Sequence, residues 1–169
     1  MPFVKGGEVV EDSFVKLDDG APVPRGGAIL VSGERLLEQA ADLLASCSRL
    51  GVGWANSADV AQLEPYLADL AVVALEFPSF RDGRAYSQAR LLRERYGFGG
   101  ELRATGQVLR DQFGFMLRAG FDSFEVEKAG DVAGFAETAA RYSVVYQPTG
   151  DGRVTALRSR LQQRQSQSI

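Results

Sequence analysis

Residues 71–77 read Ala-Val-Val-Ala-Leu-Glu-Phe, an apolar run interrupted by one acid. Such a run is typical of a strand that is buried on both faces, as the strands of a parallel sheet are. A helical pattern of apolar residues follows over residues 83–96, and the Gly-Phe-Gly-Gly stretch at 97–100 ends it. A buried strand followed by an amphipathic helix is the repeating unit of a parallel sheet. This stretch therefore predicts an α/β fold.

The same alternation of strand and helix patterns runs along most of the chain. Further strands are expected at 28–31, 52–55, 101–105, 123–126 and 142–146, and further helices at 34–50, 59–69, 108–119 and 131–141. We expect a single α/β domain over residues 1–149, with a mainly parallel open sheet of five or six strands flanked by helices. The last units repeat roughly every 20 to 28 residues, a spacing also found in (β/α) barrels. A complete barrel needs about 250 residues, so a partial (β/α) barrel is the alternative.

The two ends of the chain read differently from this central part. Residues 1–27 predict a short β-hairpin, with strands at 3–5 and 9–17, followed by a loop. Residues 150–169 contain several Gln and Ser residues and a weak apolar pattern. We expect a mobile tail there.

Several kinds of chemistry are excluded by what the sequence lacks. The 169 residues include no histidine and one cysteine, Cys47. Histidine acid–base catalysis, His-ligated haem, iron–sulfur clusters and thiolate zinc sites are therefore excluded. The chain also has no G-x-G-x-x-G and no G-x-x-x-x-G-K-[ST] motif. We expect no metal, no cofactor and a colourless protein, and whether it is an enzyme stays open.

The expected location is the cytoplasm. Residues 1–7 read Met-Pro-Phe-Val-Lys-Gly-Gly, which lacks the apolar stretch of a signal peptide. No run approaches the roughly 18 to 20 apolar residues of a membrane span, so no membrane contact is expected. A lone cysteine cannot form an internal disulfide, which suits a reducing compartment.

Charge is distributed unevenly along the chain, whose net charge is −3. Residues 1–80 carry 5 basic and 12 acidic side chains, whereas residues 81–118 carry eight arginines, no lysine and four acids. An acidic total argues against nucleic-acid binding, which usually needs a basic domain. The arginine-rich stretch within residues 77–126 is the expected working surface, because arginine suits carboxylates and oxyanions.

Residues 80–87 read Phe-Arg-Asp-Gly-Arg-Ala-Tyr-Ser and directly follow the strand at 71–77. Loops that leave the carboxyl ends of parallel strands are where α/β proteins bind ligands. A helix start capped by Asp82 and flanked by guanidinium groups suits an anion. We expect a small oxyanion or an acidic partner to bind the following residues: Arg81, Asp82, Gly83, Arg84, Tyr86, Ser87, Arg103 and Arg110. The alternative is a capped surface helix with solvated arginines.

Three charged residues fall late in, or inside, apolar strand patterns: Glu76, Arg103 and Glu125. A buried unpaired charge costs several kcal/mol, so such residues are usually paired or functional. We expect Glu76 and Arg103 to be at least partly buried and in salt-bridge contact, with Glu125 completing a row across neighbouring strand ends. The alternative is that each side chain points to solvent.

The sequence resembles a family at four places. They are 80–95 (Phe-Arg-Asp-Gly-Arg-Ala-Tyr-Ser-Gln-Ala-Arg-Leu-Leu-Arg-Glu-Arg), 100–106 (Gly-Glu-Leu-Arg-Ala-Thr-Gly), 110–112 (Arg-Asp-Gln) and 120–125 (Gly-Phe-Asp-Ser-Phe-Glu). These stretches resemble bacterial domain-of-unknown-function family 934, whose members are labelled as oxidoreductases involved in sulfite reduction. The resemblance is close over residues 77–126, weak over residues 1–60 and absent in the tail. It implies a pathway, sulfur assimilation, and assigns no catalytic residue.

Three functions are kept open by this resemblance and by the residues. The first is an accessory protein that docks on the siroheme sulfite reductase hemoprotein or its electron donor through arginines. The second is a small enzyme with an oxyanion or phosphate site at the carboxyl ends of the strands, with Glu76 or Asp82 as its acid–base group. The third is a protein that handles a carboxylate-rich tetrapyrrole. A homodimer is a further expectation, because Val108 and Phe115 fall off the main apolar stripe of their helix.

Overall fold

The computed structural model describes residues 3–126 and residue 160. Its strands are β1 (Phe3–Lys5), β2 (Glu8–Val10), β3 (Val15–Lys16), β4 (Ala28–Ser32), β5 (Arg49–Trp54), β6 (Leu70–Phe77), β7 (Glu101–Gly106) and β8 (Ser123–Glu125). Its helices are α1 (Gly33–Ser46), α2 (Arg84–Arg90) and α3 (Phe113–Ala119), with the 3-10 helices η1 (Val60–Tyr66) and η3 (Arg110–Gln112) and the π-helical turn η2 (Leu91–Arg95). The helix expected at 131–141, the strand at 142–146 and the tail at 150–169 lie outside the described residues.

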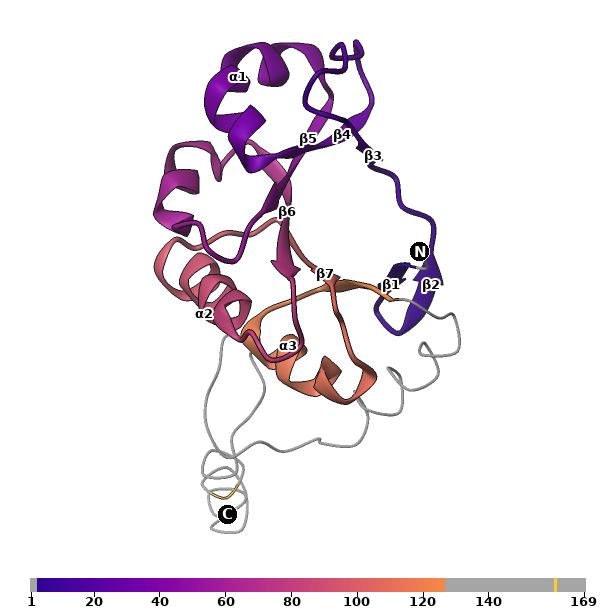
Figure 1. Cartoon of the computed structure of the whole chain (residues 1–169), viewed down its shortest axis with the longest axis vertical. Coiled ribbons are helices and arrows are strands. Elements are labelled where there is room, and N and C mark those ends of the chain that lie inside the picture. Colours follow the sequence, from indigo (N-terminus) through magenta and orange to yellow (C-terminus); the bar gives the residue numbers. More distant parts are fainter. Residues whose placement is uncertain (1–2, 127–159, 161–169) are drawn as a thin grey trace, which may run out of the picture.

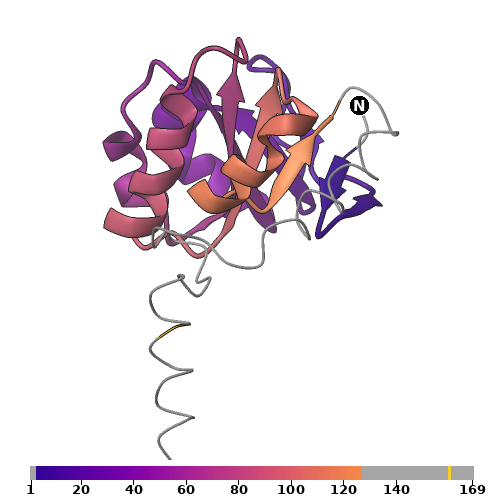
Figure 2. The same ribbon diagram turned by 90° about the horizontal axis from the view of Figure 1, so that it is seen from below.

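All eight described strands belong to one sheet, in the order β2-β1-β8-β7-β6-β5-β4-β3. The strands from β3 to β8 pair in parallel and in chain order, and the hairpin of β1 and β2 joins antiparallel to β8. Right-handed crossovers that always step in the same direction place all helices on the same face of a sheet. The sheet is curled, with α1, α2 and α3 on its outer side (Figures 1 and 2).

The expected α/β fold with mainly parallel strands is confirmed. The six parallel strands fit the expected number, and the hairpin extends the same sheet instead of standing apart from it. The curl makes the sheet a half-barrel, so the partial-barrel alternative describes the shape better than an open sheet does (Figure 1). The sheet is mixed, because the hairpin strands run antiparallel.

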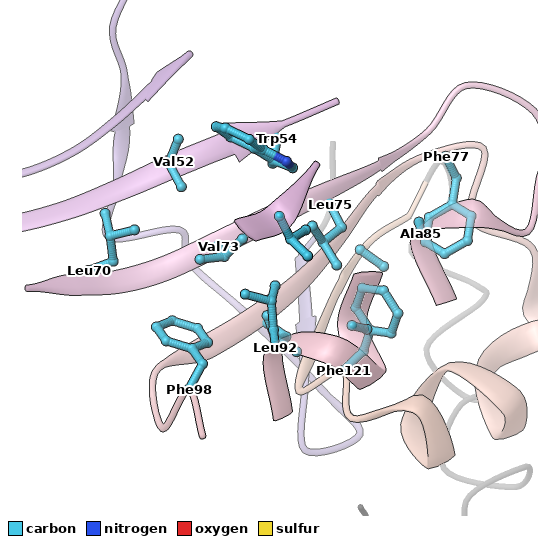
Figure 3. Close-up of a cluster of buried hydrophobic side chains, with 14 of the residues drawn as sticks. Val52, Trp54, Leu70, Val73, Leu75, Phe77, Ala85, Leu92, Phe98 and Phe121 are labelled. Atoms are coloured by element: carbon cyan, nitrogen blue, oxygen red, sulfur yellow. The ribbon is translucent and has the colours of Figure 1, made fainter. Parts of the chain in front are cut away.

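The main core lies between the sheet and the helices. Strand residues that point to this face, among them Val52, Val73 and Leu75, pack against Leu36, Leu43, Ala85 and Leu92 of the helices, all 0 % exposed. Figure 3 shows this layer, with Phe77 and Phe121 at one end and Phe98 at the other. The buried strand predicted at 71–77 is β6, which lies near the middle of the sheet.

Several predicted boundaries differ from the structure: the helix expected at 59–69 is the 3-10 helix η1, and the helix expected at 108–119 is α-helical only from Phe113. The helix expected at 34–50 ends at Ser46, because the amide of Cys47 bonds back to Leu43 and the chain then turns extended. Strand β5 consequently starts at residue 49, three residues earlier than the sequence pattern suggested. The strand expected at 9–17 is two strands, β2 and β3, because the chain leaves the hairpin after Val10 and crosses to pair with β4.

The crossing segment, residues 11–14, covers part of the helix-free face of the sheet. Phe14 is buried there, and a Cβ added to Gly51 would lie 3.4 Å from its ring. The guanidinium group of Arg49 lies 4.6 Å from the centre of the same ring. The N-terminal segment thus supplies a second, smaller apolar layer inside the curl.

Candidate functional site

The carboxyl ends of β5, β6 and β7 lie side by side in the sheet and are followed by the loops 55–59, 78–83 and 107–109. Gly106 makes the turn out of β7 possible. Its φ is +83°, and a Cβ there would lie 2.4 Å from the carbonyl oxygen of Phe77. The Gln107 amide donates to that same carbonyl oxygen at 2.8 Å. Because a side chain at residue 106 would collide with the neighbouring strand, this turn requires glycine.

Two glutamines hold the loop after β6 against the loop after β7. The backbone N–H of Phe80 donates to Oε1 of Gln107 at 3.2 Å, and Nε2 of Gln112 donates to the carbonyl oxygen of Phe80 at 3.1 Å. The ring of Phe80 is nevertheless 44 % exposed. The guanidinium group of the exposed Arg81 lies 5.4 Å from the ring centre. The loop therefore presents an aromatic and a cationic side chain on a fixed backbone.

Asp82 and Arg84 form an exposed ion pair at the start of α2. The Arg84 Nη2 atom lies 2.6 Å from Oδ2 of Asp82, and the Arg84 backbone N–H donates to Oδ1 at 3.2 Å. Hydrogen bonds from Arg84 hold the pKa of the Asp82 carboxyl well below its usual range, and the neighbouring Asn56 side chain adds to this. The N-cap is Gly83, one residue later than expected. The protein's own carboxylate thus already occupies the place proposed for an anion, and whether a free anion binds there stays a prediction.

Tyr86 faces the interior more than the solvent. Its ring lies 5.2 Å from that of Phe77 in an edge-on arrangement and 6.4 Å from that of Phe121. Burial, helped by the charge of Asp111, raises the pKa of Tyr86 to about 12. Ser87, the next residue, is exposed. These positions favour a packing role for Tyr86, which lies at the border of the loops.

Arg110 begins η3 and is exposed beside Leu109, which is 39 % exposed. The structure therefore places five of the eight predicted binding residues at this carboxyl edge: Arg81, Asp82, Gly83, Arg84 and Arg110. We call Phe80, Arg81, Leu109 and Arg110 the edge surface. Arg103 is absent from it, because its side chain lies on the helix-free face of the sheet.

Arg103 belongs to a charge cluster that we define as Lys5, Asp12, Glu101, Arg103 and Ser123. Its Nη1 and Nη2 atoms lie 2.7 Å and 3.0 Å from the two carboxylate oxygens of Asp12. Its Nε and Nη2 atoms donate to Oε1 of Glu101 at 3.2 Å and 3.1 Å. Ser123 donates to the same Glu101 oxygen at 2.8 Å, and Lys5 Nζ lies 2.6 Å from Oε2. The cluster ties the N-terminal segment to β7 and β8.

The charges of this cluster balance within it. The Arg103 guanidinium group also lies 4.1 Å from the ring centre of Phe3 and 5.6 Å from that of Phe14. Burial alone would raise the pKa of Glu101, but hydrogen bonds from Lys5 and Ser123 and the charges of Arg103 and Lys5 lower it overall. A buried arginine with two carboxylate partners and two flanking rings has a structural role in this fold.

The expected row of Glu76, Arg103 and Glu125 is therefore wrong, although the burial of Arg103, 3 % exposed, is confirmed. The strand register places Arg103 opposite Ala74, whereas Glu76 lies opposite Thr105, two residues or about 7 Å further along. Glu76 is exposed and Glu125 is partly buried. Arg103 instead pairs with Glu101, which precedes it on the same face of β7, and with Asp12 of the N-terminal segment.

Comparison with known proteins gives one family. Residues 51–157 match a family described as bacterial protein of unknown function, DUF934. The chain belongs to this family. The match confirms the resemblance found in the sequence, and its description assigns no activity. No curated protein and no solved structure matches the chain.

The DUF934 segment contains the whole edge surface, but it begins after Lys5 and Asp12. Half of the charged side chains in the charge cluster thus come from outside the family segment. Glu101 was not predicted as a partner of Arg103, although the i, i+2 spacing of these residues on a strand puts both on one face. No sequence signal identifies Asp12, Gln107 or Gln112, whose contacts depend on the tertiary fold.

Residues 3–126 and 160 contain no group of three or more His, Cys, Asp or Glu side chains placed to hold a metal ion. Over the same residues, no helix is both long enough and apolar enough to span a membrane.

Proposed function

We propose that this protein is an accessory protein of sulfite reduction in sulfur assimilation, which docks on an acidic surface of the sulfite reductase hemoprotein or its electron donor. The pathway comes from the family resemblance over residues 77–126. The docking role is supported by the edge surface, where Phe80 and Arg81 project from a loop held on both sides by glutamines. A lone cysteine suits the cytoplasm as the place of this activity.

The observation that carries the proposal is the fixed backbone of Phe80. An exposed aromatic side chain and an arginine are the residue types that dominate binding energy at protein interfaces. Binding usually costs free energy for ordering loops and side chains, and a backbone already held by hydrogen bonds avoids part of that cost. Arg110 and the exposed Leu109 extend the same surface, so a partner with carboxylates around an apolar pocket would fit it.

The test is a binding measurement between this protein and immobilised sulfite reductase hemoprotein, repeated with its electron donor. Wild-type protein is expected to bind one of the two with a Kd on the order of micromolar, and more weakly as salt is raised, because charge attraction is screened. Arg81→Glu should weaken binding at least tenfold by placing a like charge against the partner's carboxylates.

Arg95→Glu is the matched control. Arg95 is also exposed and also lies over the ring of its sequence neighbour, 5.5 Å from the centre of Tyr96, but it lies at the end of η2 and outside the edge surface. It should leave binding unchanged. Absence of wild-type binding to both partners would reject the proposal, and so would an equal loss in the two variants.

A further inference from the structure

Three of the seven large apolar side chains that are exposed in the described part of the chain lie around the start of α3. Phe80 is 44 %, Leu109 39 % and Phe115 68 % exposed. The other four lie on different elements, namely β2, β3, α1 and η2. Single exposed apolar residues are common on protein surfaces, but several that gather in one place indicate an interaction site.

Gln112, the N-cap of α3, connects these three residues. Its backbone N–H donates to the carbonyl oxygen of Leu109 at 3.0 Å, and its Nε2 atom donates to the carbonyl oxygen of Phe80 at 3.1 Å. Phe115 lies three residues after Gln112 on the same side of the helix, a spacing at which Cβ atoms are about 5–6 Å apart. The surface formed by Phe80 and Leu109 therefore continues onto α3 as far as Phe115.

The packing of α3 fixes the backbone that carries Phe115. Its neighbours Phe113 and Met116 are both 0 % exposed and belong to the core, and the ring of Phe113 lies 5.1 Å from that of Phe124. Within residues 3–126, the ring of Phe115 makes no aromatic contact. An exposed aromatic side chain on a fixed backbone loses little conformational freedom when a partner binds it.

We propose that Phe115 is the main apolar contact of the docking surface and enters an apolar pocket on the acidic partner. This inference rests on the proposed docking function and adds to it a residue that determines affinity. Charge favours an acidic partner, because Arg81 and Arg110 belong to the same surface and residues 81–118 carry eight arginines and four acids. A second copy of this chain fits less well, since a two-fold contact would place the same arginines against each other.

The test measures binding of Phe115→Ala to the immobilised sulfite reductase hemoprotein and to its electron donor. The variant should weaken the wild-type interaction at least tenfold without changing its salt dependence, because it removes apolar area and no charge. Arg81→Glu should instead weaken binding and also reduce its salt dependence. Phe115→Leu keeps an apolar side chain and should recover part of the affinity.

Leu37→Ala is the matched control, because Leu37 is 42 % exposed but lies on α1. It should bind like the wild type, and an equal loss in Leu37→Ala and Phe115→Ala would overturn the inference. Unchanged binding of Phe115→Ala beside a loss in Arg81→Glu would overturn it and leave the docking function intact, whereas absence of wild-type binding to both proteins would overturn both. Sedimentation provides a further check: a wild-type dimer that Phe115→Ala abolishes would overturn the inference, because a second copy would then cover Phe115.

Discussion

Arg103 and Arg81 are both arginines of the same 38-residue arginine-rich stretch, 81–118, but the fold treats them in opposite ways. Arg103 is buried, forms ion pairs with Asp12 and Glu101 and lies close to the rings of Phe3 and Phe14. Arg81 is exposed and lies over the ring of Phe80 at the end of the sheet. The charge cluster links segments within the chain, whereas the edge surface is exposed to solvent. A stretch rich in arginine therefore does not by itself identify a binding surface, because some of its arginines form ion pairs inside the fold.

Arg93, which lies outside the charge cluster, also forms hydrogen bonds and an ion pair within the fold. Arg93 donates to the carbonyl oxygens of Gly120, Phe98 and Gly100 at 3.1, 2.5 and 2.8 Å and pairs with Asp122 at 2.5 Å. Arg93 thereby fixes the turns before β7 and β8. The exposed Arg81 of the edge surface is thus a better candidate for partner contact than the number of arginines in the stretch indicates.

The largest expected effect tests whether the charge cluster is structural. Arg103→Met should lower the free energy of unfolding by about 3–5 kcal/mol, because it leaves the carboxylates of Asp12 and Glu101 without their buried partner. Arg90→Met is the control, since Arg90 forms an exposed i,i+4 pair with Glu94 worth at most about 0.5 kcal/mol. Urea unfolding of both variants measures the difference. Equal stability of the two variants would show that Arg103 is not a structural residue.

The sequence predicted the fold class well because periodicity and burial are local signals. The apolar run at 71–77 gave β6 nearly at its true boundaries, and the helix predicted at 83–96 covers α2 together with the π-helical turn η2. The hairpin was predicted, but its place beside β8 was not, because β1 and β8 are more than 100 residues apart. Strand order within a sheet depends on such distant pairings, which a single sequence does not encode in any short pattern.

The candidate site was predictable in part. The loop after β6 was identified because ligand loops follow the carboxyl ends of parallel strands. The partner of Arg103 was misassigned, because the parallel register of β6 and β7 is shifted by two residues from the one that would pair it with Glu76. The contacts of Gln88 with the carbonyl oxygens of Ala55 and Ala58 could not be predicted from the sequence, because they depend on how α2 packs against the turn after β5.

The second prediction concerns the pH dependence of stability, which the charge cluster should affect and the edge surface should not. The pKa of Glu101 is lowered in the folded protein, so its contribution to stability is present above its unfolded value and is lost as the pH falls through the folded pKa. Unfolding free energies measured by urea between pH 7 and pH 2.5 should therefore fall on acidification. Glu101→Gln should be less stable at pH 7 and should fall less steeply, because its side chain does not titrate.

Glu64→Gln is the control for this pH series. Glu64 is exposed on η1, so its removal should leave the wild-type profile unchanged. Parallel profiles of wild type and Glu101→Gln would show that the cluster does not hold the Glu101 carboxylate in its charged form. A flat wild-type profile over the whole acid range would contradict the prediction as well.

The smallest expected effect tests whether the edge surface is fixed in advance. The Phe80 backbone N–H is held by Gln107 and its carbonyl by Gln112, both at partly or fully exposed positions. Such a hydrogen bond contributes about 0.5–1.5 kcal/mol, which corresponds to a roughly 2- to 12-fold change in an opening equilibrium. Gln107→Ala should therefore speed hydrogen exchange of the Phe80 amide by about that factor, while amides of β6 keep their protection because the core is untouched. Gln62→Ala should change neither. An unchanged Phe80 exchange rate in Gln107→Ala would mean that the loop is not held by this bond, and the docking proposal would lose the preorganised backbone on which it rests.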